Sequence, residues 1–159
     1  MTKLIDDNRE ILHQLGTESR IIYVEKQEII SLHSRVIKEF KGAEGIRDLG
    51  LLESALSKPM NLSVYEDESD PVKLACSLSY GIISNHPFND GNKRAGFLAL
   101  ALFLNKNNVD FNCDKNAKLN LIRNVASGNV TVEQFAEEVQ SLLDEANKSK
   151  LEGHLKGPK

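Results

Sequence analysis

The ten residues from Ala95 to Leu104 are all apolar, counting Gly96, and they restrict the fold of this 159-residue chain more than any other feature. A helix that is apolar on every side has no face to turn to water, so it must be surrounded by protein. The run is well short of the ~18 consecutive apolar residues that a membrane-spanning helix requires. The sequence therefore predicts a buried central helix around which the other elements pack.

Amphipathic helices are predicted on both sides of this run. Apolar residues recur at helical spacing between positions 24 and 40. Asp48 is a candidate N-cap of a short helix that Pro59 ends, which leaves residues 59–70 as an acidic connection. The first twenty residues are predicted to add a loosely packed helix.

Three further helix starts are marked by their capping residues. Asp70 precedes Pro71, which is an N-cap followed by proline at the first helical position. Asp114 is a candidate N-cap, and Thr131 with Gln134 has the pattern of a capping box. Extended segments are expected only at 64–65 and 109–111, so the predicted fold class is all-α.

Composition is typical of a soluble globular protein, with 40% hydrophobic and 27% charged residues. The net charge of −3 argues against a nucleic-acid clamp built on bulk charge, so no direct nucleic-acid partner is expected. Cys76 and Cys113 are too few for a disulfide scaffold and are expected to be buried as small apolar residues. With no apolar signal segment at the amino terminus, a reduced cytoplasmic location and no membrane partner are expected.

The nine residues from His86 to Arg94 are HPFNDGNKR, a polar cluster that helix packing does not explain. They precede the buried helix, whose unpaired N–H groups and dipole favour an anion. Gly91 permits a tight turn there. Lys93 and Arg94 oppose the dipole at a cost of about 0.3 kcal/mol or more each, and a bound polyanion would reverse that sign. The pattern predicts a phosphate site.

Three other residues of the cluster have predicted roles beside such a phosphate. Asp90 is suited to hold Mg²⁺, which usually takes one or two carboxylates together with phosphate oxygens. His86 is suited to act as general base on an incoming hydroxyl, because histidine exchanges a proton near neutral pH. Phe88 is expected to point inward and anchor the loop. A zinc site built on His86 and Asp90 would need a further ligand, and no other histidine has a matching spacing.

The cluster as a whole resembles the motif H-P-F-x-[DE]-G-N-[GK]-R of the Fic/Doc (Fido) superfamily. Lysine at the eighth place, here Lys93, is the form seen in death-on-curing (Doc) toxins. Residues 45–56, GIRDLGLLESAL, are similar to a segment of Doc-like proteins. The resemblance extends from about residue 21 to residue 143.

The resemblance implies an all-α Fic fold, a single-domain helical bundle with the motif loop between two central helices. The corresponding division of the chain is an amino-terminal extension over 1–20, the Fic/Doc domain over 21–147 and a disordered tail over 148–159.

The resemblance also implies a substrate and a role for each motif residue. The substrate is ATP with Mg²⁺, from which a group passes to a protein Ser/Thr hydroxyl. The implied roles are general base for His86, magnesium ligand for Asp90, buried anchor for Phe88, anion nest for Gly91 and Asn92, and phosphate contacts for Lys93 and Arg94.

Doc toxins phosphorylate elongation factor Tu and arrest translation, and an antitoxin suppresses them. The leading hypothesis is therefore a Doc-like, Mg-ATP-dependent protein kinase that acts as a toxin and has an antitoxin partner. AMP transfer to a protein hydroxyl and a non-catalytic interaction module with a vestigial nucleotide site are the alternatives.

Two departures from the pattern bear on these alternatives. AMP-transferring enzymes usually carry a second arginine where this chain has Phe97, and with Lys93 this favours γ-phosphoryl transfer over AMP transfer. Ser141 and Glu145 have the spacing of a self-inhibitory helix, but Ala146 follows and Phe97 offers the glutamate no partner. Self-inhibition is not expected.

Two segments outside the motif have open interpretations. Arg47 and Asp48 are interpreted as a helix cap with a surface charge rather than as part of a site. Residues 59–69 are interpreted as a solvated connection, with recognition of a target peptide as the alternative.

Overall fold

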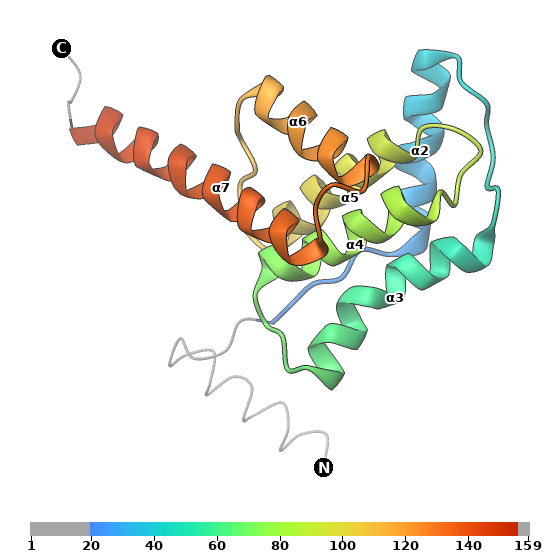
Figure 1. Ribbon diagram of the computed structural model, residues 1–159, viewed down its shortest axis with the longest axis horizontal. Coiled ribbons are helices and arrows are strands. Elements are labelled where there is room, and N and C mark those ends of the chain that lie inside the picture. Colours follow the sequence, from blue (N-terminus) through green and yellow to red (C-terminus); the bar gives the residue numbers. More distant parts are fainter. Residues whose placement is uncertain (1–19, 156–159) are drawn as a thin grey trace.

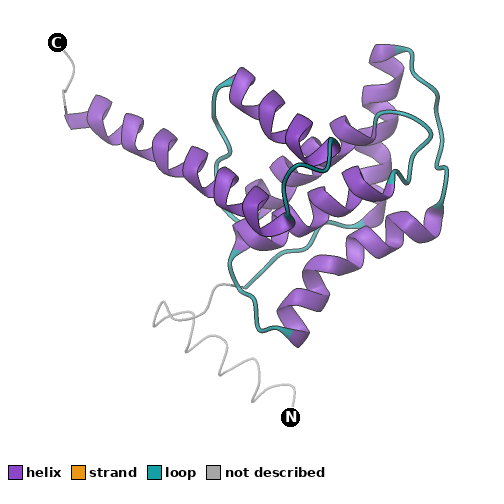
Figure 2. Ribbon diagram, in the orientation of Figure 1, coloured by secondary structure: helices purple, strands orange, loops and turns teal. Residues whose placement is uncertain are grey.

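The computed structural model describes residues 20–155, and these residues form six α-helices and no strand (Figures 1 and 2). The predicted all-α fold class is confirmed for this part of the chain. In chain order the helices are α2 (Lys26–Phe40), α3 (Leu49–Tyr65), α4 (Pro71–Asn85), α5 (Asn92–Lys106), α6 (Lys115–Ala126) and α7 (Val132–Leu155).

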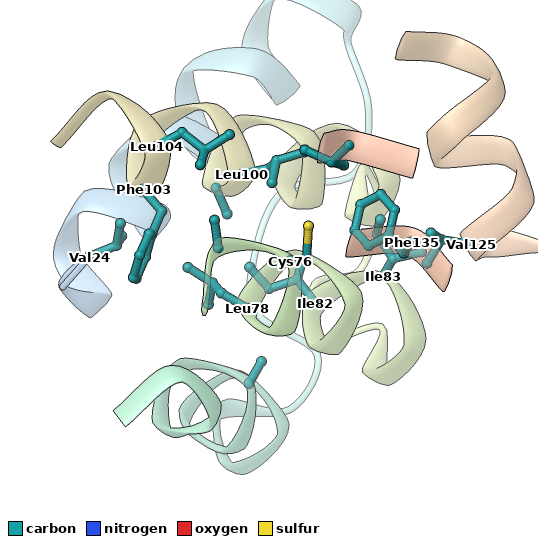
Figure 3. Close-up of a cluster of buried hydrophobic side chains, with 14 of the residues drawn as sticks. Val24, Cys76, Leu78, Ile82, Ile83, Leu100, Phe103, Leu104, Val125 and Phe135 are labelled. Atoms are coloured by element: carbon teal, nitrogen blue, oxygen red, sulfur yellow. The ribbon is translucent and has the colours of Figure 1, made fainter. Parts of the chain in front are cut away.

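Helix α4, rather than the apolar helix α5, is the most enclosed element. Ten of the fifteen residues of α4 are buried, against six of the fifteen in α5. Small residues of α4 allow neighbouring helices to approach closely: Gly81 faces Ala55 of α3, and the Ser79 hydroxyl donates to the Gly96 carbonyl of α5 at 2.7 Å. Figure 3 shows the resulting core, with side chains of α4 and α5 facing one another and Phe135 of α7 at one side.

The expectation that α5 is buried on all sides is wrong for one face. Leu98, Ala101 and Leu102 are partly exposed and line a hollow of about 320 Å³ beside Leu32 and Phe111. The helix lies against α2, α4 and α6, and these three neighbours do not enclose its whole surface. Among the described residues, no helix is long and apolar enough to cross a membrane.

The predicted helix starts are confirmed by their hydrogen bonds. The carboxylates of Asp48, Asp70 and Asp114 accept from backbone amides in the first turns of α3, α4 and α6. At the start of α7, the Thr131 amide donates to Gln134 Oε1 at 2.8 Å and the Gln134 amide to Thr131 Oγ1 at 3.1 Å. These caps depend on residues within three positions of one another, so they could be identified from the sequence.

The prediction that Pro59 ends a helix is wrong, because α3 continues through it to Tyr65. Proline removes one intrahelical donor but does not prevent a helix from continuing when later residues gain burial. Leu62, beyond the proline, packs against the core. Residues 59–65 are therefore helical rather than a loop, and the extended segment predicted at 64–65 is absent.

The prediction of a disordered tail from residue 148 is wrong for 148–155, which continue α7. Residues 148–152 include neither proline nor glycine, and Lys150 Nζ lies 3.0 Å from Asp110 Oδ2 in the loop before α6. Both features support further turns of helix. Residues 156–159 and the helix predicted within the first twenty residues, apart from Arg20, lie outside the described residues.

The two cysteines differ in burial. Cys76 is fully buried in α4, as predicted, and burial raises the pKa of its thiol. Cys113 is only partly buried and lines a hollow of about 540 Å³ between α6 and α7. Both are free thiols.

A charged pair links the start of α2 to the end of α5. Glu28 Oε1 accepts from the Glu25 amide at 3.0 Å, which completes a capping box, and it also pairs with Lys106 Nζ. Burial alone raises the pKa of the Glu28 carboxyl, but the hydrogen bonds from Lys106 and the Glu25 amide, together with the positive charge of Lys106, outweigh burial. The net pKa is lowered from 4.5.

Replacing Gly96 by alanine is expected to destabilise the fold, although alanine favours an ordinary helix by about 1 kcal/mol. A Cβ at position 96 would collide with the Ile83 side chain and lie 3.2 Å from the Ser79 carbonyl oxygen. Overpacking of this kind costs about 1–3 kcal/mol. Urea unfolding of Gly96→Ala measures the loss, with Asn120→Ala on the exposed side of α6 as the control. A Gly96→Ala protein as stable as wild type would contradict the close packing of α4 on α5.

The stabilising effect of Lys106 is expected to depend on pH. The pKa of Glu28 is lower in the folded than in the unfolded protein. The ionised carboxylate therefore contributes fully to the free energy of unfolding above the unfolded-state pKa near 4.5, and this contribution is lost as the pH falls through the folded-state pKa. The difference in unfolding free energy between wild type and Lys106→Met should therefore shrink below about pH 4.5. Urea titrations from pH 7 to pH 3.5 would measure it, with Lys115→Met as the control for loss of one exposed charge. A difference that stays constant over this range would rule the coupling out.

Candidate active site

The motif loop joins the end of α4 to the start of α5, as predicted. His86 is the C-cap of α4, with an exposed side chain and left-handed backbone angles (φ 51°, ψ 56°). Gly91 is the N-cap of α5 and is also left-handed (φ 74°). The backbone angle favours glycine, and a Cβ on Gly91 would also lie 2.8 Å from Ile37 Cδ1 of α2, which would have to move.

The segment before α3 pairs with the motif loop along its backbone. The Arg47 and Asp48 amides donate to the Pro87 carbonyl at 2.7 and 3.0 Å, and the Asn89 amide donates to the Gly45 carbonyl at 3.1 Å. Ile46 and Phe88 form an isolated antiparallel bridge. The two stretches that carry the family resemblance are thus in direct contact.

Arg47 also holds the end of α4 with its side chain. Its Nε donates to the His86 carbonyl at 2.7 Å and its Nη2 to the Asn85 carbonyl at 2.9 Å. These carbonyls are at the negative end of the helix dipole, where a cation is favourable. The capping role predicted for Asp48 is confirmed, since its Oδ1 accepts from the Leu51 amide at 3.0 Å. Arg47 is more than a surface charge, because it fixes the turn that carries His86.

Phe88 is buried as predicted, at 1% exposure, and its ring stacks on His33 of α2. The ring centroids are 3.7 Å apart and the planes differ by 11°. His33 is only 4% exposed, and its Nε2 lies 2.7 Å from the Asp90 carbonyl oxygen. Because a carbonyl only accepts, Nε2 carries the proton.

Sequence reasoning did not identify His33 as part of the site. The signal that could have found it is a histidine between Ile29 and Ile37 on the apolar stripe of α2, where a buried polar group requires a partner. The partner comes from the motif loop, 57 residues away.

Backbone amides on two sides orient the Asp90 carboxylate. Oδ1 accepts from the Gly91 amide at 2.8 Å, and Oδ2 accepts from the Ala43 amide at 3.3 Å. A Cβ at position 42 would lie 2.5 Å from Oδ2, so glycine there leaves room for the carboxylate in this orientation. The exposed carboxylate keeps lone pairs free on both oxygens.

The donor set around Asp90 fits magnesium better than zinc. In the part of the chain that the structure describes, no group of three or more His, Cys, Asp or Glu side chains gathers to hold a metal. Protein zinc sites need at least three such ligands, whereas Mg²⁺ is commonly held by one carboxylate, phosphate oxygens and water.

The Asn92 side chain closes the motif loop rather than extending from it. Its Oδ1 accepts from the Phe88 amide at 2.9 Å, and its Nδ2 donates to the Phe88 carbonyl at 3.0 Å. The first intrahelical bond of α5 runs from the Ala95 amide to the Gly91 carbonyl at 2.9 Å. The amides of residues 92–94 precede that bond, so they form the donor end of the helix.

The two cations of the motif are both exposed. Lys93 and Arg94 lie in the first turn of α5, and the Arg94 guanidinium carbon is 3.2 Å from the centroid of the Phe40 ring. The helix start therefore combines amide donors, the positive end of a dipole and two fixed positive charges, which is an arrangement that attracts a polyanion.

Phe97 stands where AMP-transferring enzymes usually carry a second arginine, and its ring packs against another aromatic side chain. Phe97 lies 6.1 Å from Phe111 between ring centroids, and Lys118 Nζ is 5.6 Å from the Phe97 ring. Glu145 lines the hollow between α6 and α7, and the last turns of α7 extend away from the motif loop (Figure 1).

The Asn92 side chain is expected to be a main support of the loop. Asn92→Ala leaves the Phe88 amide and carbonyl without partners in a part-buried place, which costs about 1–3 kcal/mol. Asn89→Ala is the matched control, because it removes one exposed bond, to the Glu44 carbonyl. Chemical unfolding of both variants measures the difference. Equal losses would contradict the role of Asn92.

Comparison with known proteins agrees with this architecture. The family model described as Fic/DOC family matches residues 23–104, about half of the chain, which include helices α2 to α4, the whole motif loop and all but the last two residues of α5. A search of curated proteins found no match. On the strength of this match the chain belongs to the Fic/DOC family, whose members are in general transferases that act on proteins.

Proposed function

We propose that this protein transfers the γ-phosphoryl group of ATP to a Ser/Thr hydroxyl of another protein, with Mg²⁺ as cofactor. The observation that carries the proposal is the start of α5, where the amide donors of residues 92–94 and the cations Lys93 and Arg94 adjoin an oriented carboxylate, Asp90. These groups together suit a polyphosphate and its metal ion.

The phosphates would lie at the amino end of α5. A nucleotide triphosphate brings negative charge to a place where two cations otherwise oppose the helix dipole, so binding would turn an unfavourable arrangement into a favourable one. Arginine offers its planar N–H donors in pairs to phosphate oxygens, and lysine contributes a compact charge.

Asp90 would hold the metal ion. Its carboxylate is oriented by two amides and does not need to reorganise when a cation arrives. Bound Mg²⁺ supplies charge neutralisation for the phosphate oxygens.

His86 would accept the proton of the target hydroxyl. In the proposed reaction the hydroxyl oxygen bonds to the γ-phosphorus, the bond from that phosphorus to the β–γ bridging oxygen breaks, and ADP leaves. The exposed side chain and the clamp of Arg47 on the His86 carbonyl would present the imidazole to an external substrate. A positioned base of this kind typically contributes 10²–10⁴-fold to the rate.

Phosphoryl transfer is preferred to AMP transfer because of Phe97. Its ring packs with Phe111, so position 97 offers no phosphate contact. With a single arginine in the motif, the α-phosphate would be poorly aligned for attack. AMP transfer by the same residues is the second candidate function.

The biological setting of the proposal comes from the resemblance to Doc toxins. A translation-arresting toxin, elongation factor Tu as target, an antitoxin partner and a cytoplasmic location are parts of this proposal. A non-catalytic interaction module with a vestigial nucleotide site is the rival outside enzymes.

The decisive experiment incubates the protein with ATP labelled at either the α or the γ position, Mg²⁺ and a bacterial lysate. A labelled protein is expected with γ-labelled ATP and not with α-labelled ATP. His86→Ala should lower the labelling by at least ~10²-fold while the variant remains folded. Arg123→Ala, an exposed arginine of α6, is the control.

The other outcomes separate the rivals. Protein labelling from α-labelled ATP would reject kinase chemistry in favour of AMP transfer. No labelling from either position, and no binding of Mg-ATP by calorimetry, would favour the interaction module.

A further inference from the structure

Phe40 is a large apolar side chain that the core does not use. It is the last residue of α2, its side chain is 58% exposed, and Lys41 then ends the helix in a left-handed conformation. The ring carries the Arg94 guanidinium on its face, with 3.2 Å between Cζ and the ring centroid. This is within the range of a cation–π contact.

The contact is the last of three that one face of α2 makes with the motif. His33, Ile37 and Phe40 are spaced at i, i+4 and i+7, so they lie on the same side of the helix. His33 reaches the Asp90 carbonyl, and Ile37 Cδ1 lies so close to Gly91 that a Cβ there would be 2.8 Å away. Phe40 continues the row to Arg94, in the first turn of α5.

Stacking restrains a guanidinium without consuming its hydrogen-bond donors. The ring contacts the flat face of the group, whereas all five N–H donors point outward in its plane. Arginine otherwise loses considerable rotamer freedom when it binds a ligand, and a group that is already restrained loses less. Stacking on Phe40 thus holds the Arg94 guanidinium in place and does not use the N–H donors that a ligand would need.

We propose that Phe40 is a positioning residue that holds the Arg94 guanidinium ready for a nucleotide phosphate. The inference rests on the proposed function, since it requires a polyphosphate at the start of α5. The opposite effect, in which stacking withdraws Arg94 from the phosphates, makes the opposite prediction for binding.

The test measures binding of Mg²⁺ with a non-hydrolysable ATP analogue by calorimetry. Phe40→Leu keeps an apolar side chain but removes the aromatic face, and it should weaken binding about two- to fivefold. Phe40→Trp should retain or improve wild-type affinity, because tryptophan is the best cation–π partner. Tyr65→Leu is the control, an aromatic residue of α3 with 81% exposure.

A double-mutant cycle separates positioning from general structural damage. In an Arg94→Gln background, Phe40→Leu should cause no further loss of affinity, since the cation that Phe40 holds is gone. Melting temperatures of all variants should stay near their parents, because the Phe40 side chain is largely exposed.

Each contrary result has a distinct meaning. Three results would overturn the role of Phe40 and leave the proposed function standing. Phe40→Leu could bind the analogue as tightly as wild type, it could bind it more tightly, or it could lose as much affinity in the Arg94→Gln background as in the wild-type background. No binding of the analogue by the wild-type protein would overturn both.

Discussion

The close packing of α4 against α5 is the constraint on which the candidate site depends. Gly96 allows the helices to approach until Ser79 Oγ bonds to its carbonyl at 2.7 Å, and a side chain at this position would collide with Ile83. Two helices in such contact leave only a short gap between the end of one and the start of the other. Five residues, 87–91, cross that gap after His86, so His86 and the donor end of α5 are held near each other by the packing of the core.

More contacts hold the backbone of the motif loop than its conformation alone would need, which suits a functional site. Left-handed residues begin and end it at His86 and Gly91, and conformations of this kind cost ~1–3 kcal/mol for a non-glycine residue unless the surroundings require them. Here the surroundings do so on three sides. The segment before α3 pairs with the backbone, α2 supports Phe88 and Asp90 through His33, and Asn92 closes the loop from within. Such rigidity keeps the side chains of the candidate site in place without the help of a ligand.

Some charges in this protein stabilise the fold, whereas others are suited to bind a ligand. Arg47 is placed where a cation is favourable, at the carbonyl end of α4, and Glu28 with Lys106 links two helices. Lys93 and Arg94 are placed where cations are unfavourable, at the amide end of α5, and within residues 20–155 a compensating contact is seen for Arg94 alone, with Phe40. The contrast between these placements is what distinguishes the candidate site from the rest of the polar surface.

The sequence by itself determined the features that depend on near neighbours along the chain. The caps at Asp48, Asp70, Asp114 and Thr131, the all-helical class and the polar cluster before α5 are set by residues within a few positions of each other, and each could be predicted. Only the tertiary structure decided that α3 passes through Pro59, that α4 takes the centre of the bundle, and that Arg47, His33 and Phe40 support the motif loop. These three residues lie between 38 and 57 positions before the groups that they contact. Their roles follow from the packing of helices distant in sequence, which local periodicity does not specify.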